Sequence, residues 1–508
     1  MGLRRFFGGI ALPAMTPAAS PVERLPLPAR LRVPLLQHTG VEAEACVAIG
    51  ERVARFQRIG RMAEGETGAD VHAPAAGVVV ALERSPVAMP GTPLAMHVVI
   101  QVDAAPAAAH HEAPDDARLP PLDPAGAPID ALRARIADAG IVGLGGAGFP
   151  TVAKLDVGRR LLILNGAECE PVVACDEALL RERASEVLDG GRLLARLCGA
   201  TRILLAMEER MVSALPAVRA ALAETADIEL VLLPDRYPAG GERQLIQALT
   251  GEQVPDSGLP RDLGVLVQNV ATAYAALRAA RNGEPLVSRF VTVGGDGLDA
   301  ATTFEVAIGT PASALAAALG GWRPDAAVLR AGGPMMGVAL PDDDVAVGKT
   351  TNAMTAWRDA AQAGSGNATA AQPCIRCGDC ASACPARLQP QLLHARLVAL
   401  DAPGAQALGL VACIECGACD TVCPSAIPLT AGFVAARREA RLGVFQREQA
   451  DAARRRFERR VERLQRECEQ ASLAQAARLK RVSGAAAAAL AKARAKRDAA
   501  GSTPGGAP

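Results

Sequence analysis

The sequence predicts a multidomain chain of α/β and α+β type, and three observations support this fold class. The chain has 508 residues, which is too many for a single hydrophobic core. Strand-like and helix-like segments alternate over residues 129–285, as in a parallel sheet covered by helices. Two copies of one cysteine motif over residues 374–424 mark a further small domain.

Composition excludes several classes of protein. Hydrophobic residues make up 50% of the chain and the mean hydropathy is +0.17, so the chain is not disordered throughout. The 54 basic and 54 acidic residues cancel, so the net charge gives no indication of nucleic-acid binding. No segment approaches the ~20 apolar residues that a membrane-spanning helix needs. We therefore expect an intracellular protein that meets a membrane only through partners.

Short apolar runs between glycines and prolines predict an all-β domain over residues 26–104, after an N-terminal segment at 1–25. Its VxxGERVxxFQRIG and VHAPAAGVV stretches resemble the lipoyl/biotinyl barrel-sandwich fold. The modified lysine of that fold is missing, so we expect a structural version. Residues 105–128 are rich in proline and alanine and predict a linker. His110 and His111 within it lack a third ligand, so we expect them to be solvated rather than metal-bound.

Composition shifts place the remaining boundaries. The predicted parts after the linker are an α/β domain at 129–285, a smaller α+β unit at 286–345, a linker at 346–372, a cysteine-rich domain at 373–435 and a charged, alanine-rich helical tail at 436–508. The strands expected in the α/β domain are at 161–165, 201–207 and 228–233, and its helices are at 176–197, 212–224 and 241–250.

Eight cysteines form two copies of C-x2-C-x2-C-x3-C-P. This spacing is typical of paired [4Fe–4S] clusters, in which three close cysteines hold one cluster and the fourth ligates the other. We therefore assign cluster 1 to Cys374, Cys377, Cys380 and Cys423, and cluster 2 to Cys384, Cys413, Cys416 and Cys419. Zinc sites lack the third cysteine and the Cys-Pro pair, and disulfides are disfavoured without a secretion signal. Two neighbouring clusters would conduct single electrons.

Residues 143–154, GLGGAGFPTVAK, contain the dinucleotide-binding pattern G-x-G-x-x-G. Their context argues against a Rossmann turn, because a helix-like segment precedes the loop and Pro150 stands where the helix should open. Exposed amides of the loop and Lys154 could still hold a phosphate. A turn without a ligand is the alternative.

The same loop, together with NGAECEP (165–171), resembles the flavin- and NADH-binding subunit of respiratory complex I. YPAGGERQLI (237–246) and QNVAT (268–272) resemble two later segments of that subunit. The RnfC family of the Rnf electron-transport complex is similar over nearly the whole chain, including FFGGIALP, PLLQHTG, VHAPAAG and AGGPMMG. This resemblance implies a barrel-sandwich-hybrid head, an FMN-binding α/β domain, a β-grasp module of SLBB type, a two-[4Fe–4S] ferredoxin-like domain and a helical tail.

The resemblance also implies roles for ten residues around FMN and NADH. The residues that would line the flavin phosphate and ring are Gly143, Gly145, Gly146, Gly148 and Lys154. Asn165 and Asn269 would hydrogen-bond the flavin, and the residues that would face the flavin edge or the nicotinamide nucleotide are Glu168, Glu170 and Glu242. Each glutamate could instead be a helix cap or a solvated charge. Ala167 stands where complex I subunits often carry aspartate.

The tail is basic, with 18 basic and 8 acidic residues between 436 and 500. An apolar stripe with a helical period is formed by Phe457, Val461, Leu464 and Cys468. Two interpretations remain for this tail. It is either a solvated helix or a helix that rests on anionic lipid or a partner subunit.

The resemblance implies a translocase or oxidoreductase subunit of the NADH:ferredoxin type, in which electrons enter from NADH, pass through FMN and two clusters, and leave to partner subunits. The partners would be the membrane subunits and the iron–sulfur protein RnfB of an Rnf-type complex, with ferredoxin reached indirectly and no nucleic acid. The expected location is peripheral, on the cytoplasmic side of the bacterial inner membrane. A cobalamin reductase with the same domains and a flavin-free electron relay are the alternatives.

Overall fold

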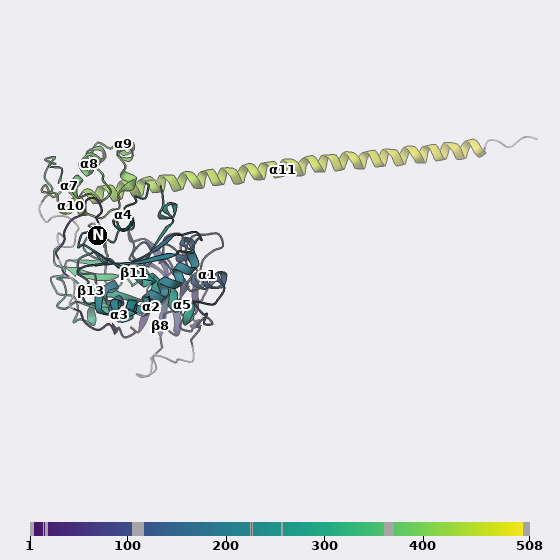
Figure 1. The fold of residues 1–508 in the computed structure, drawn as a ribbon. Helices are drawn as coiled ribbons and strands as arrows, with labels where there is room; N and C mark the ends of the chain where they lie inside the picture. The colour runs from purple at the N-terminus through teal and green to yellow at the C-terminus, as the bar shows by residue number, and fades with distance from the viewer. Residues whose placement is uncertain are drawn as a thin grey trace, which may run out of the picture. The chain divides into compact units, whose positions relative to one another are not determined.

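The computed structural model describes residues 5–13, 15, 19–103, 116–223, 225, 227–255, 258–359 and 370–500 (Figure 1). The chain divides into two units, Met1–Val434 and Ala435–Pro508. The first unit contains all of the predicted cofactor sites, and each unit is described separately below.

The all-β domain predicted near the N-terminus is confirmed. One antiparallel sheet has the order β2 (Arg30–Pro34), β8 (Leu94–Val102), β7 (Gly77–Pro86) and β4 (Arg52–Val53). The other has the order β3 (Glu44–Ala45), β5 (Arg58–Arg61) and β6 (Val71–His72). Leu31, Val33 and Val98 are fully buried, because alternate residues of each strand point into the core.

The predicted parallel α/β sheet is also confirmed. Its order is β11 (Ile228–Leu233), β10 (Arg202–Glu208), β9 (Leu161–Asn165) and β12 (Val265–Asn269). The helices of this region are α1 (Ile129–Asp138), α2 (Cys175–Cys198), α3 (Leu215–Ala223), α4 (Glu242–Thr250) and α5 (Val270–Arg281). The register pairs Asn165 with Asn269, so both side chains lie at the carboxyl edge of the sheet. Ligands of parallel sheets bind at this edge.

A mixed six-stranded sheet follows in the chain. Its order is β1 (Glu23–Arg24), β14 (Thr302–Ala307), β13 (Ser288–Gly294), β17 (Ala353–Trp357), β15 (Val328–Ala331) and β16 (Val338–Ala339), with α6 (Ala312–Ala317) in the connection after β14. Two predicted boundaries are therefore wrong. β17 lies in the predicted linker 346–372, and β1 lies in the predicted N-terminal segment 1–25. The two-residue β1 is too short to leave a periodic signal, and β17 lacks the continuous apolar run that marks β9 in the sequence.

The linker predicted at 105–128 is only partly described, and His110 and His111 lie outside the described residues. Its later part is not a free linker. The amide of Leu119 donates to the carbonyl of Gly283 at 2.8 Å, which fixes this segment just beyond the end of α5.

The cysteine-rich region forms a small helical domain (Figure 1). Its helices are α7 (Asp379–Ala383), α8 (Pro390–Val398), α9 (Ala402–Ala407), η3 (Leu410–Ala412) and α10 (Ala418–Thr421). The two motifs share one backbone path, since Arg376 and Glu415 have φ values of 58° and 60° and Gly378 and Gly417 have φ values of 89° and 73°. The repeat seen in the sequence is therefore a repeat of conformation.

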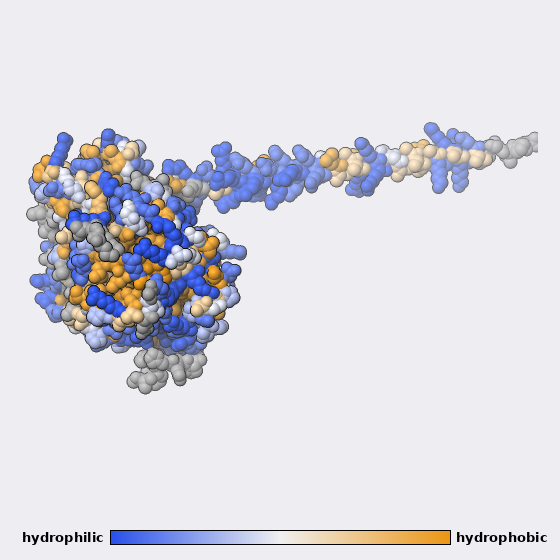
Figure 2. Space-filling view, viewed as in Figure 1, coloured by the Kyte–Doolittle hydropathy of each residue, from blue (hydrophilic) through white to orange (hydrophobic). Residues whose placement is uncertain are grey.

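The helical tail is confirmed as far as residue 500, because α11 runs over Leu429–Ala500. Figure 2 shows hydrophilic side chains gathered along its first part and alanine-rich, more apolar surface toward its end. Phe457 and Leu464 of the predicted apolar stripe are 67% and 49% exposed. Among the helices of the described chain, none combines the length and the apolar character needed to span a membrane.

We predict that Gly190→Ala destabilises the α/β domain. A Cβ atom at Gly190 of α2 would lie 2.0 Å from the carbonyl oxygen of Ala273 in α5, so the two helices would have to separate. Such overpacking costs ~1–3 kcal/mol and should lower the melting temperature. The control is Gly484→Ala in α11, where nothing lies within 4 Å and alanine favours the helix. An unchanged melting temperature for Gly190→Ala would contradict the close packing.

Candidate functional site

The tip of the glycine loop presents unpaired backbone amides. The base of the loop is closed by hydrogen bonds from the amide of Gly143 to Phe149 at 2.8 Å and from the amide of Gly148 to Gly143 at 3.1 Å. Residues 145–147 between them are exposed, and their amides have no partner among the described residues. Gly146 has a φ of +98° with open space around it. Successive free amides of this kind can bind an anion such as a phosphate.

The β-domain holds the loop from one side. The Thr39 amide donates to the Gly148 carbonyl at 2.9 Å, and the Thr39 hydroxyl donates to the Ala147 carbonyl at 2.7 Å. A Cβ atom at Gly148 would lie 3.2 Å from the Cα of His38 in the β-domain and 2.7 Å from Thr350 Cγ2, so a glycine is needed where the loop meets these two segments. Thr39 was missed in the sequence, because its partners are backbone atoms more than a hundred residues away.

Lys154 stands beside the loop at the end of a short 3-10 helix, η1 (Thr151–Lys154). Its Nζ lies 3.3 Å from Glu242 Oε1 and 5.9 Å from the ring centroid of Phe149. The Lys154 and Glu242 side chains are 33% and 41% exposed. A partly exposed ion pair of this kind is weak, so Lys154 can turn to a bound anion at little cost.

Asn165 and Asn269 lie next to each other and are half-buried at the sheet edge. Asn165 Nδ2 donates to the carbonyl of Gly240 at 2.9 Å. Asn269 caps α5 by accepting from the amide of Ala271 at 2.8 Å, and its Nδ2 donates to Asp176 at 2.5 Å. A Cβ atom at Gly145 would lie 3.4 Å from Asn269 Cβ, so the glycine loop and the strand ends form one site.

Glu168 caps the N-terminus of α2. Its carboxylate accepts from the amides of Asp176 at 3.0 Å and Glu177 at 3.1 Å, so the helix-cap alternative is confirmed for this residue. Burial, and to a lesser extent the charge of Asp176, raise the pKa of Glu168 to about 8. Burial also raises the pKa of Asp176, to about 6.

Glu170 is held in a similar way by a distant segment. Its carboxylate accepts from the amides of Met335 at 3.0 Å and Met336 at 2.6 Å, in the AGGPMMG segment. Burial raises the pKa of Glu170 to about 7. Both glutamates are thus committed to backbone amides, and their predicted place at a flavin edge or a nicotinamide stays a prediction.

The eight motif cysteines surround two separate cavities. One cavity is lined by Cys374, Cys377, Cys380 and Cys423, and the other by Cys384, Cys413, Cys416 and Cys419. These are the two sets expected for cluster 1 and cluster 2, so each cavity has the four sulfur donors that a [4Fe–4S] cluster needs. Cys374 and Cys377 are exposed, whereas Cys384 and Cys416 are buried. Burial raises the pKa of Cys416 to about 12, so a thiolate forms there only when a cation replaces the proton.

Tyr237 joins the two kinds of site and was missed in the sequence. Its hydroxyl donates to the carbonyl of Cys416 at 2.7 Å, and the side chain is 2% exposed. The YPAGGERQLI segment resembles the complex I subunit in sequence, but only the folded chain shows where the tyrosine ring points.

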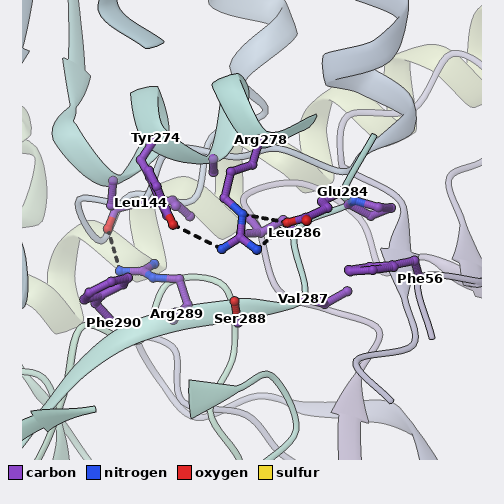
Figure 3. Close-up of a pocket in the computed structure, with 13 residues that line it drawn as sticks. Phe56, Leu144, Tyr274, Arg278, Glu284, Leu286, Val287, Ser288, Arg289 and Phe290 are labelled. Carbon is purple, nitrogen blue, oxygen red and sulfur yellow. Dashed lines mark hydrogen bonds and ion pairs between the residues drawn. The ribbon is translucent and has the colours of Figure 1, made fainter. Parts of the chain in front are cut away.

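Figure 3 shows a pocket that is lined by Leu144 of the glycine loop and contains none of the predicted site residues. Arg278 Nε donates to Glu284 at 2.6 Å, and Arg278 Nη1 donates to the Tyr274 hydroxyl at 3.2 Å. Arg289 Nη2 donates to the carbonyl of Leu144 at 3.2 Å, which supports the loop from below. Arg278 is paired with Glu284, and Arg289 is bound to the carbonyls of Lys349 and Leu144, so we read the pocket as a structural junction.

The raised pKa of Glu168 predicts a pH-dependent stability. The folded protein keeps this proton up to about pH 8, whereas an unfolded glutamate loses it near its ordinary value of 4.5. This group therefore stabilises the fold fully below pH 4.5, and the contribution is lost as the pH rises through 8. Glu168→Gln should reduce the fall in melting temperature between pH 6 and pH 8.5. The exposed Glu44→Gln is the control, and equal slopes in the two variants would refute the assignment.

Comparison with protein families identifies three domains in the chain. The model described as the Nuo51 FMN-binding domain matches residues 136–278, and that of the RnfC barrel sandwich hybrid domain matches residues 4–105. The model of the 4Fe-4S dicluster domain matches residues 373–427. The glycine loop thus lies in an FMN-binding domain, and the eight motif cysteines lie in a dicluster domain.

Whole-chain relatives agree with these domains. The C subunit of the ion-translocating oxidoreductase complex of Pseudomonas aeruginosa is 42% identical over 92% of this chain and 59% of that protein, so this chain spans less than two thirds of its length. The namesake in Rhodobacter capsulatus is 41% identical over 82% of this chain and 79% of that protein. A solved NAD+-reducing [NiFe]-hydrogenase chain is 21% identical, over 61% of this chain and 60% of that chain, with a TM-score of 0.44. The protein belongs to the RnfC family, the C subunits of ion-translocating oxidoreductase complexes.

Proposed function

We propose that this chain takes electrons from NADH through FMN and passes them singly through two [4Fe–4S] clusters to partner subunits of an ion-translocating complex. One observation carries the proposal. A compact unit brings a cradle of free amides beside Lys154 together with two cavities of four cysteines each. FMN supplies the change from a two-electron donor to one-electron acceptors, and the protein sets position and electrostatics.

The residues around the glycine loop fit FMN. The amides of residues 145–147 and the Lys154 ammonium are suited to the flavin phosphate, with Gly143 and Gly148 closing the base of the loop. The carboxyl edge, with Asn165 and Asn269, is the side from which the ring would be held. Because all their partners are on the protein, these side chains are fixed before any ligand binds.

For NADH, Glu242 is the available carboxylate of the three predicted glutamates. It is the first residue of α4, is partly exposed, and is paired only weakly with Lys154. Glu168 and Glu170 are suited to a different task, which is to tie the NGAECEP segment to the start of α2 and to the AGGPMMG segment by accepting from backbone amides there. We therefore propose Glu242 as the glutamate that faces the nucleotide.

The partners and the location follow from family membership. We propose that the chain docks on the membrane subunits and the iron–sulfur protein RnfB of an Rnf-type complex, on the cytoplasmic side of the inner membrane, with ferredoxin reached indirectly. The basic α11 is the segment suited to anionic lipid or an acidic partner. We further propose that the six-stranded sheet is of the SLBB β-grasp type. A cobalamin reductase and a flavin-free relay are the competing functions, and family membership favours the first proposal.

The proposal is tested on protein purified without oxygen. We expect about eight irons per chain, because two clusters of four irons each fill the two cavities, and one acid-released FMN. NADH should then bleach both the flavin and the cluster absorbance. Eight irons with no flavin after reconstitution, and no response to NADH, would show a relay instead. Cob(II)alamin added as acceptor separates the reductase alternative, which requires its NADH-dependent reduction.

We predict that Thr39→Val weakens FMN binding. The variant keeps the shape of the side chain but removes the hydrogen bond to the Ala147 carbonyl, which orders the loop tip. A hydrogen bond contributes ~1 kcal/mol, which corresponds to roughly a fivefold rise in the Kd for FMN. Titration of the flavin-free protein with FMN, followed by quenching of flavin fluorescence, measures this constant. Thr201→Val removes an exposed hydroxyl far along the chain and should leave the Kd unchanged.

A further inference from the structure

We infer that electrons enter the ferredoxin-like domain at cluster 2 and leave it from cluster 1, and that Tyr237 is the positioning residue that fixes the flavin site to cluster 2. This inference rests on the proposed function and adds the order of the carriers and one further residue to it. It follows from contacts that reach one of the two four-cysteine cavities and not the other.

Tyr237 makes a direct hydrogen bond from the α/β domain to a cysteine of the cluster 2 cavity. Its buried hydroxyl donates to the carbonyl of Cys416, one of the four cysteines of that cavity. The ring packs in an apolar group with Ile10, Ala383 and Ala418. A buried hydroxyl without a partner is costly, so this bond fixes the ring and the cysteine loop together.

The other side of Tyr237 leads to the predicted flavin site within a few residues. Tyr237 belongs to the turn that ends at Gly241, where α4 begins with Glu242. Within this turn, the carbonyl of Gly240 accepts from Asn165 Nδ2 at 2.9 Å. A chain of contacts therefore runs from Asn165 through the turn to Tyr237 and on to Cys416.

Further contacts on the same cavity come from other parts of the first unit. Gln244 Nε2 of α4 donates to the carbonyl of Pro385 at 3.3 Å, next to the cluster 2 ligand Cys384. The amide of Gly9 donates to the carbonyl of Ala383 at 2.8 Å. The Met335 carbonyl lies near Gly417, since a Cβ atom at Gly417 would be 3.5 Å from it. The cluster 2 cavity is thus surrounded by residues that precede the cysteine-rich domain in the chain.

The contacts around cluster 1 come from its own domain. Cys380 Sγ lies 3.4 Å from Gln391 Oε1, and the Ser425 hydroxyl donates to the carbonyl of Pro373 at 3.0 Å. Among the described residues, no hydrogen bond or ion pair joins the four cysteines of cluster 1 to residues before 370. Cys374 and Cys377 are exposed, and Ile375 between them is 68% exposed. Cluster 1 therefore faces outward, where an acceptor can reach it.

The number of electrons supplied by one NADH matches the number that the two clusters can accept. One NADH supplies two electrons and leaves NAD+ and one proton, and each of the two clusters takes one electron. In this order the first electron would be passed on to cluster 1, held by the exposed cavity, and the second would remain on cluster 2. No further donor or acceptor is needed until cluster 1 is oxidised by a partner.

The first test compares Tyr237→Phe with Tyr274→Phe in the reconstituted holoprotein. The chain has two tyrosines, and Tyr274 also makes a hydroxyl hydrogen bond but lies away from the clusters, so it is a matched control. Tyr237→Phe should slow the NADH-driven bleaching of the clusters roughly tenfold, with iron and FMN contents unchanged. It should also lower the midpoint potential of cluster 2 and leave that of cluster 1 unchanged, because the hydroxyl that donates to the Cys416 carbonyl is lost. Equal rates and potentials in the two variants would overturn the role of Tyr237.

The second test removes one cluster at a time. Cys377→Ala should lose cluster 1 and half of the iron, yet NADH should still reduce the remaining cluster, with one electron taken instead of two. Cys416→Ala should keep a cluster that dithionite reduces but that NADH reduces at least tenfold more slowly. The opposite pattern would overturn the order of carriers while leaving the proposed function intact. Failure of the wild-type protein to bind FMN or to react with NADH would instead reject the proposed function.

Discussion

The candidate site depends on the parallel pairing of β9 with β12, which places Asn165 opposite Asn269. From this edge, Asn165 bonds to the turn before α4, and Asn269 bonds to Asp176 near the start of α2. Three loops that are distant in the sequence thereby share one framework. A slip of one residue in this register would put Asn165 and Asn269 on opposite faces of the sheet and separate the loops.

Polar bonds between domains make the first unit a single body. Lys349 is fully buried, and its Nζ donates to the carbonyls of Asp70 at 2.6 Å and Gly140 at 2.8 Å. These carbonyls belong to the β-domain and to the turn before the glycine loop, so one side chain ties three regions together. Burial lowers the pKa of this lysine to about 7. The barrel-sandwich head lacks the modified lysine of its fold. In this chain it instead holds the glycine loop in place.

Elements with strong local signals were predicted closely. β9 and β11 have the predicted bounds, 161–165 and 228–233, because a continuous apolar run flanked by polar residues is typical of a buried parallel strand. The strands β1 and β17 were not predicted, since their pairing with β14, β13 and β15 is made by the backbone across long sequence separations. Glu168 and Glu170 are site candidates from the sequence. Their partners could not be predicted, because backbone amides leave no pattern of residue types.

The sequence by itself determined the chemistry of the protein, because the spacing of the cysteines and the glycines is local. Cys374, Cys377 and Cys380 are brought to one cavity by seven consecutive residues, and Gly146 is needed for a turn with a positive φ. Only the tertiary structure decided what surrounds each site. Thr39 on the glycine loop and Tyr237 on Cys416 are contacts between backbone carbonyls and side chains over a hundred residues apart, which follow from packing and leave no pattern along the chain.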